Sequence, residues 1–166
     1  MKTSRSSPVR FWIAIALIAI FARTAWAGSA KVTYVTDGDT LWVRPGGAGK
    51  PIKIRIDGID APEICQAGGE AARAALASRV VGRTVVFSTR RQDDYGRHVA
   101  TIELDGEDVA AWMVGQGHAW SYQIRRDGSP YRALQIEARS ARRGLFAQPG
   151  AMHPRVFRRQ HGSCRT

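Results

Sequence analysis

Three clusters of charged residues in the sequence carry side chains that suit chemistry on a phosphate. They read DGDT over 37–40, RIDGIDAPE over 55–63 and DDYGR over 93–97. The carboxylates of the first two clusters are hard oxygen donors, which suit Ca²⁺ or Mg²⁺ rather than a metal that prefers thiolate or imidazole ligands. Their spacing is not that of an EF-hand, because the D-x-D-x-D-G loop with its closing glutamate is absent.

Two arginines and a further carboxylate complete this set. Arg55 and Arg97 are planar forks that can neutralise phosphate oxygens, and Glu63 can take a proton from water. Each cluster alone could be an ordinary turn or a solvated loop, since aspartate beside glycine is a common turn pair. Taken together, they are the side chains that metal-assisted hydrolysis of a phosphodiester needs.

The elements that must position these clusters can be read from periodicity. Alternation of apolar and polar residues predicts five short strands, at 31–36, 40–44, 51–56, 84–88 and 98–102. Apolar residues at helical spacing predict helices at 70–81, 109–114 and 129–143. Strands with helices after the third and the fifth predict an α+β fold, a small OB-like barrel with added helices.

The composition is basic and rich in arginine. The 166 residues hold 25 Lys and Arg against 14 Asp and Glu, a formal charge of +11, and 21 of the basic residues are arginine. Arginine grips phosphate oxygens two at a time, which favours a polyanionic partner, although a G+C-rich genome also raises arginine content. A hydrophobic content of 44% rules out a fully disordered basic chain, and two cysteines exclude a disulfide-rich miniprotein.

The N-terminus has the pattern of a signal peptide. Basic residues precede an apolar run over 11–22, and Ala25 and Ala27 fit the A-x-A cleavage rule. That run reaches roughly 18 Å as a helix, well short of the ~30 Å bilayer core, which favours a cleaved leader over 1–27 rather than an uncleaved anchor. Residues 28–166 would keep 21 basic against 14 acidic residues, a charge of +7, and we expect no stable membrane association after cleavage.

Export changes the interpretation of Cys65 and Cys164, because two thiols outside the cytosol usually end as a disulfide. Such a bridge would tie the basic tail, 148–166, back to the segment that holds Asp60 and Glu63. In the loop-entropy model it would stabilise the fold by ~4–5 kcal/mol, less any strain. Two separate thiols remain the alternative, since the sequence cannot measure their distance.

The C-terminal region is basic throughout. Residues 138–166 contain seven arginines and no acidic residue. This pattern is typical of a solvated, partly disordered tail, and it also suits a basic segment that attracts and binds nucleic acid. The two interpretations are compatible with each other.

The order of five motifs carries a family resemblance. DGDT, RIDGIDAPE, DYGR, GQGHAW and EARSARRGLF, spread over residues 31–147, closely resemble the staphylococcal-type nuclease, or thermonuclease, family, in a secreted bacterial form. The resemblance implies a five-stranded OB-fold barrel with three helices over 28–147, followed by the tail. It also implies a Ca²⁺ requirement and cleavage of DNA and RNA at the bond to the 5′ oxygen, which leaves 3′-phosphate ends.

The same resemblance assigns the metal ligands by motif position. The ligands implied are two carboxylates and one backbone carbonyl, those of Asp39, Asp60 and Ala61. Asp37 would lie beside the ion without binding it. Because only the carbonyl of Ala61 is needed, the alanine in place of the family's usual threonine changes little.

The catalytic residues implied are Arg55, Glu63 and Arg97, and Tyr95 matches an aromatic residue of the substrate pocket. A diester phosphate gains negative charge as water attacks, so Ca²⁺ and two arginines would stabilise the transition state more than the ground state. Tyr122 is the further candidate for substrate binding. Like Trp120, it could stack on a base or pack in the core.

The leading hypothesis is therefore an exported, monomeric, calcium-dependent nuclease, periplasmic or extracellular, that acts on DNA and RNA. One alternative is a non-catalytic OB module that binds nucleic acid without cutting it, for which Glu63 would be unnecessary. Another is an exported calcium-binding structural protein, which would leave Arg55 and Arg97 unexplained.

Overall fold

The computed structural model describes residues 26–46, 48–122 and 128–164. Within them the strands are β1 (Trp26–Asp37), β2 (Thr40–Pro45), β3 (Ile52–Ile56), β4 (Ile59–Asp60), β5 (Thr84–Gln92), β6 (His98–Leu104), β7 (Glu107–Asp108) and β8 (Trp120–Ser121). The helices of the described residues are α1 (Gly69–Val80), α2 (Val109–Gly115), α3 (Arg132–Ser140) and α4 (Pro154–His161), with a 3₁₀ turn at Gly144–Ala147.

Five of the strands close into a barrel, as predicted. β1, β2 and β3 form an antiparallel meander, and β1 also pairs with β5, which pairs with β6. The parallel pairing of β3 with β6 closes the sheet. β1 can join both halves because it is 12 residues long and its ladder to β2 has two register shifts, which bend and twist a strand. The α+β, OB-like fold is confirmed.

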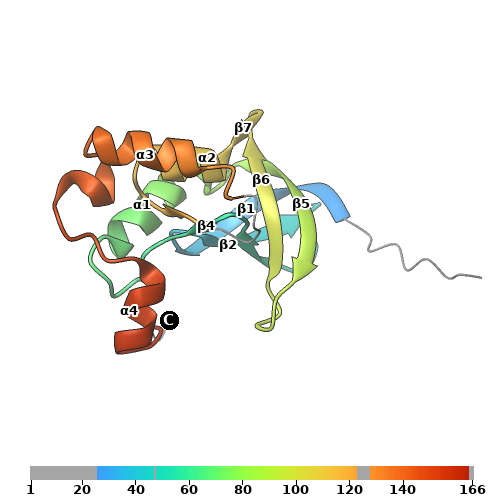
Figure 1. Cartoon of the computed structure of the whole chain (residues 1–166). Coiled ribbons are helices and arrows are strands. Elements are labelled where there is room, and N and C mark those ends of the chain that lie inside the picture. Colours follow the sequence, from blue (N-terminus) through green and yellow to red (C-terminus); the bar gives the residue numbers. More distant parts are fainter. Residues whose placement is uncertain (1–25, 47, 123–127, 165–166) are drawn as a thin grey trace, which may run out of the picture.

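The barrel interior follows the predicted alternation. Its fully buried side chains come from alternate strand positions and include Leu41, Val43, Ile54, Ile56, Val85, Phe87 and Ile102. Helix α1 contributes Ala72, Leu76 and Val80 to the same core. Figure 1 shows α1, α2 and α3 gathered at one side of the barrel, so the strand surfaces away from them stay available to solvent.

The small sheet formed by β4 and β8 joins the barrel to the helical side. Asp60 of β4 lies opposite Trp120 of β8. Because this pairing holds the chain directly after β3, it places the second acidic cluster beside the helical part of the molecule. Tyr122 N–H extends the contact by donating to the carbonyl of Gly58 (2.8 Å).

The three predicted helices are present, although the predicted helix over 129–143 is shorter and begins at Arg132. Helix α4 was not predicted, because it is only 8 residues long and has just two apolar side chains, Val156 and Phe157, after its proline. It begins with Pro154 at the first helical turn, and His153 Nδ1 caps it by accepting from Arg155 N–H (3.2 Å). Part of the basic tail is therefore ordered rather than extended in solvent.

The predicted disulfide between Cys65 and Cys164 is present, with 5.9 Å between the two Cα atoms. The predicted leader lies outside the described residues except for Trp26 and Ala27, whose backbones pair with Thr89 and Ser88 of β5. The cleavage point after Ala27 stays a prediction. Among the helices of the described ranges, none has the length and apolar character needed to cross a membrane.

Candidate active site

Asp39 lies in the tight turn between β1 and β2, and its carboxylate is fully engaged. Its Oδ1 accepts from Thr40 Oγ1 (3.0 Å), its Oδ2 accepts from Ala61 N–H (2.7 Å), and its own N–H donates to Asp37 Oδ1 (3.0 Å). Gly38 is required here because a Cβ at this position would lie 2.7 Å from the Cβ of Ala61. Close packing of the turn thus joins the first acidic cluster to the second.

Arg55 joins the carboxylates of these two clusters. Its Nη2 lies 3.2 Å from Asp39 Oδ2 and 3.3 Å from Asp60 Oδ1, and its Nη1 donates to the carbonyl of Ile56 (3.0 Å). Asp39 and Asp60 are only 6% and 1% exposed, so this ion pairing takes place away from bulk water. Two buried carboxylates that share one cation are strongly coupled to any further charge that enters the site.

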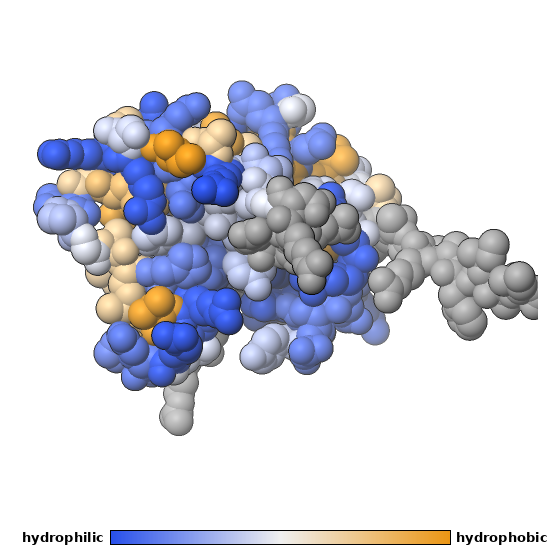
Figure 2. Space-filling view, viewed as in Figure 1, coloured by the Kyte–Doolittle hydropathy of each residue, from blue (hydrophilic) through white to orange (hydrophobic). Residues whose placement is uncertain are grey.

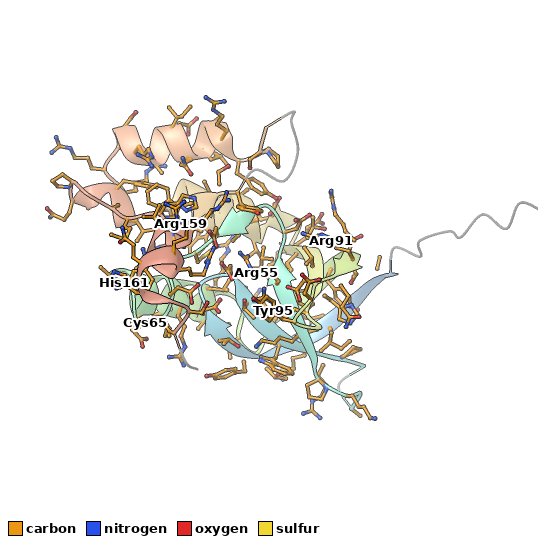
Figure 3. The ribbon with its side chains drawn as sticks, turned by 60° about the horizontal axis from the view of Figure 1, so that its bottom comes forward. Arg55, Cys65, Arg91, Tyr95, Arg159 and His161 are labelled. Carbon is orange, nitrogen blue, oxygen red and sulfur yellow. A yellow bond between two sulfur atoms is a disulfide. The ribbon has the colours of Figure 1, made fainter. Side chains whose placement is uncertain are left out.

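One pocket of about 420 Å³ brings together most of the predicted site residues. Those that line it are Asp37, Asp39, Arg55, Ala61, Glu63, Tyr95 and Arg97. Asp60 and Tyr122 line an adjoining pocket of about 170 Å³, which shares Arg55 and Arg97 with the first. In Figure 3, Arg55 and Tyr95 lie near one another, to the right of the tail helix that carries Arg159 and His161. The order of motifs therefore predicted a true spatial cluster.

Burial and a neighbouring acid shift the first carboxyl of the site. Burial, followed by the charge of Asp39, raises the pKa of Asp37 to about 7. A cation near this turn would oppose that shift, because it favours the ionised form. Within the described ranges, however, no group of three or more His, Cys, Asp or Glu side chains is arranged to hold a metal. Two carboxylates and a backbone carbonyl, the predicted ligand set, do not require such a group.

Arg97 lies at the turn between β5 and β6 and is oriented by Asp93. Its Nε donates to Asp93 Oδ2 (2.8 Å) and its N–H to Asp93 Oδ1 (2.9 Å). The guanidinium carbon also lies 5.3 Å from the ring centroid of Tyr95. With 85% of its surface exposed, Tyr95 is free to meet a substrate.

The contact between Asp93 and Arg97 gives a testable pH dependence. Burial alone raises the pKa of Asp93, but hydrogen bonds and the charge of Arg97 outweigh it and lower that pKa. A carboxyl with a lowered folded pKa stabilises the fold above its unfolded value of ~3.9 and loses this contribution as the pH falls through the folded value. We therefore expect the free energy of unfolding of Asp93→Asn to fall less steeply at acidic pH than that of the wild type.

The measurement is the urea midpoint of the wild type and Asp93→Asn from about pH 6 downward. The matched control is Asp94→Asn, which removes an exposed carboxylate at the next position. If Asp93→Asn loses stability at low pH as steeply as the wild type and Asp94→Asn do, the assigned role of Asp93 is wrong.

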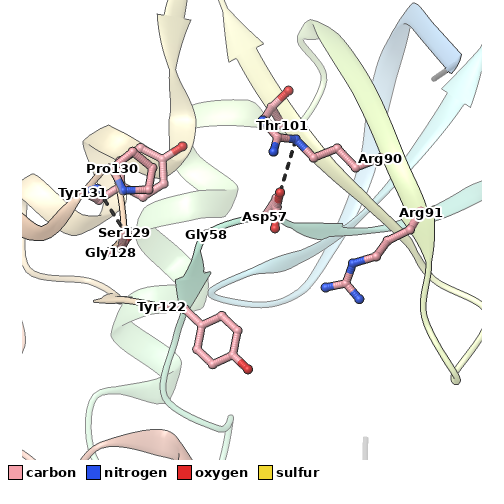
Figure 4. A pocket seen from close by; sticks show the side chains of 10 residues that line it. All are labelled: Asp57, Gly58, Arg90, Arg91, Thr101, Tyr122, Gly128, Ser129, Pro130 and Tyr131. Carbon is pink, nitrogen blue, oxygen red and sulfur yellow. Dashed lines mark hydrogen bonds and ion pairs between the residues drawn. The ribbon is translucent and has the colours of Figure 1, made fainter. Parts of the chain in front are cut away.

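Trp120 and Tyr122 differ in their surroundings, which resolves the two interpretations of these aromatic residues. Trp120 is 4% exposed and packs edge-on against Phe146, with 4.9 Å between ring centroids, so it belongs to the core. Tyr122 is 38% exposed and lines both the 170 Å³ pocket and a further pocket of about 250 Å³. Figure 4 shows the latter, where Arg91 and the ion pair of Arg90 with Asp57 lie near Tyr122.

Arg158 is the site residue that the sequence did not reveal. It comes from α4 and lines both the 420 Å³ and the 170 Å³ pockets. Its Nη2 lies 3.0 Å from Asp60 Oδ2, and its Nη1 donates to Glu63 Oε1 (2.9 Å). The one available signal was Cys164, because a bridge to Cys65 brings the tail close to Glu63.

Comparisons with known proteins show the family of this chain. The family model described as staphylococcal nuclease homologue matches residues 53–148. The chain belongs to the staphylococcal nuclease family. A relative named micrococcal nuclease from Shigella flexneri is 34% identical over 89% of this chain and 90% of its own. Protein ParB of Escherichia coli is 35% identical over 99% and 98%, and an uncharacterized endonuclease of Haemophilus influenzae is 33% identical over 80% and 74%.

Membership in the staphylococcal nuclease family makes this chain a nuclease, a hydrolase of nucleic-acid phosphodiester bonds. Hydrophilic residues cover much of the face in Figure 2. The excess of 25 Lys and Arg over 14 Asp and Glu suits a polyanionic substrate. The matched region begins at Lys53 on β3 and ends after the 3₁₀ turn, so it contains Arg55, Glu63 and Arg97 but not α4.

Proposed function

We propose that the chain is an exported, calcium-dependent nuclease that hydrolyses DNA and RNA and leaves 3′-phosphate ends. The observation that supports this most directly is the pocket of about 420 Å³ in which Asp39 and Glu63 lie together with Arg55, Arg97 and Arg158. A site that only bound nucleic acid would need the arginines, but it would gain nothing from a carboxylate facing the phosphodiester.

Calcium suits the donor chemistry of this pocket. Arg55 Nη2 already lies within 3.3 Å of both the Asp39 and the Asp60 carboxylates, so one positive centre can face both. Carboxylate and carbonyl oxygens suit a hard cation, and Asp39, Asp60 and the Ala61 carbonyl leave room for water and phosphate among roughly 6–8 ligands. Bound there, the ion would supply positive charge to the phosphate as a Lewis acid.

The chain's own residues then have separate tasks. Glu63 orients the attacking water and accepts its proton as the water oxygen bonds to phosphorus. Arg55 and Arg97 donate to the phosphate oxygens, which carry more negative charge in the transition state than in the ground state. We assign Arg97 to the 5′ oxygen, which leaves with the electron pair of the broken P–O bond and takes up a proton.

Export is supported by the pattern of the leader and by the disulfide of Cys65 with Cys164. Disulfides persist in oxidising compartments such as the periplasm or the extracellular medium. We infer that the nuclease works there as a monomer, without stable attachment to the membrane.

The test is to incubate the purified chain 28–166 with single-stranded DNA and with RNA, in the presence of Ca²⁺ or of a calcium-specific chelator, and to map the product ends. We expect fragments with 3′-phosphates in calcium and intact substrate in chelator. Binding without cleavage across several divalent metals would contradict the proposal and favour a nucleic-acid-binding module. Products with 5′-phosphates would contradict the assigned bond.

A further inference from the structure

The segment that follows the matched region folds back over the candidate active site. The disulfide of Cys65 with Cys164 closes a loop of chain whose ends are 99 residues apart. At the other end of the segment, Gln66 Nε2 donates to the carbonyl of Met152 (2.6 Å), and Gln66 is 7% exposed. Helix α4 is therefore held at both ends against the loop that follows Glu63, and we call residues 151–164 the strap.

Arg158 is the residue of the strap that enters the site. Its two terminal nitrogens donate to the two carboxylate oxygens of Asp60, Nη1 to Oδ1 at 3.2 Å and Nη2 to Oδ2 at 3.0 Å. The same Nη1 also donates to Glu63 Oε1 (2.9 Å). This bidentate, charge-assisted contact is the strongest kind that arginine makes with a carboxylate.

Asp60 cannot serve this contact and a metal ion equally well. The Asp60 side chain is only 2% exposed, and its Oδ1 also lies 3.3 Å from Arg55 Nη2. A divalent cation bound to Asp60 would meet the guanidinium of Arg158 at close range with little solvent screening, and like charges at such distances repel strongly. The ion and the Arg158 contact must therefore compete.

We propose that Arg158 is a positioning residue that holds Asp60 and Glu63 in the calcium-free nuclease and lowers its affinity for calcium. This inference rests on the proposed function of the same site. When the cation binds, the contact between Arg158 and Asp60 breaks. Because Nη1 of Arg158 donates to both Asp60 and Glu63, its hydrogen bond to Glu63 weakens as well. Calcium binding thereby makes Glu63 available to water.

The disulfide strengthens this competition by keeping Arg158 near the site. A tethered group competes as if present at high local concentration, and it loses that advantage when the tether is cut. The shielding of Asp60 should consequently be weaker when Cys65 and Cys164 cannot pair. Calcium affinity would then depend on whether the strap is bonded.

The experiment measures the Kd for Ca²⁺ by titration calorimetry on the chain 28–166, without nucleic acid. We expect Arg158→Ala to bind calcium roughly tenfold more tightly than the wild type, within the usual range of coupling between two binding events. Arg158→Lys, which keeps the charge, should stay closer to the wild type. The matched control is Arg159→Ala, at the exposed neighbouring position of α4, which should leave the Kd unchanged.

The direction of the change separates this role from a structural one. If Arg158 only supported the fold, its removal would loosen the site and weaken calcium binding. An Arg158→Ala Kd equal to or weaker than that of the wild type overturns the inference while the proposed calcium site stands. Absence of calcium binding in every variant overturns both. A Cys65→Ser, Cys164→Ser double variant should also bind more tightly, and an unchanged Kd there refutes the part assigned to the tether.

Discussion

Replacing Glu63 with glutamine is expected to lower kcat by roughly 10²–10⁴-fold, the usual range for loss of a general base. Glutamine keeps the size and an acceptor oxygen but cannot take a proton from water. Glu63 takes no part in the hydrogen bond from Ala61 N–H to Asp39 Oδ2, so the change should leave that contact intact. Affinity for nucleic acid should accordingly stay close to that of the wild type.

The measurement combines single-turnover cleavage with equilibrium binding of a fluorescent oligonucleotide. Glu70→Gln is the matched control, because the Glu70 carboxylate on α1 is 73% exposed and pairs only with Arg73 among the ion pairs of the described residues. Unchanged turnover in Glu63→Gln would remove Glu63 from the mechanism. An equal loss in both variants would point to a general effect of charge.

Replacing Arg97 with alanine should have an even larger effect, roughly 10³–10⁵-fold in kcat, by analogy with arginines that stabilise phosphoryl-transfer transition states. The reason is that, in the proposed mechanism, Arg97 faces a charge that grows as the P–O bond breaks. Asp93 already orients its guanidinium, so the side chain does not have to be organised during the reaction. Lysine at this position should rescue only part of the loss, because it cannot donate two parallel hydrogen bonds.

The split between kcat and KM checks this assignment. An interaction made mainly in the transition state lowers kcat and kcat/KM together, whereas uniform binding raises KM alone. Arg83→Ala is the control, since Arg83 is 55% exposed and pairs with Asp105 at the surface. A rise in KM with unchanged kcat would show that Arg97 binds the substrate without assisting the leaving oxygen.

Helix α4 shows why the tail was the least predictable part of the fold. The five predicted strands alternate apolar and polar residues, and the three predicted helices carry enough apolar side chains to be recognised, because these elements bury side chains in the core. Of the residues of α4, only Pro154 is fully buried, and its other contacts are made by Arg158 and by residues of neighbouring loops. A helix of 8 residues held by one proline, one ion-paired arginine and a nearby disulfide is too short and too polar to be recognised from its apolar period.

Local sequence patterns were enough to predict the types of group in the site and their order along the chain: the acidic turn, Arg55 on its strand, Glu63 after Pro62, and Arg97 at a hairpin. Turn chemistry and alternation are local, so they can be read without coordinates. They also sufficed to indicate the family, because a nuclease site of this kind is assembled from short motifs at fixed spacing.

Which of these groups form ion pairs with one another could be seen only in the folded chain. Arg55 contacts Asp39 because Thr40 of β2 lies opposite Arg55 of β3, and it contacts Asp60 a few residues further along the chain. Arg158 contacts Asp60 and Glu63 across 98 and 95 residues. Such contacts depend on the path of the whole chain, whose alternatives differ in free energy by amounts that no local pattern records. Asp60, which the family resemblance assigns to calcium, is in the folded chain also held by an arginine of the tail.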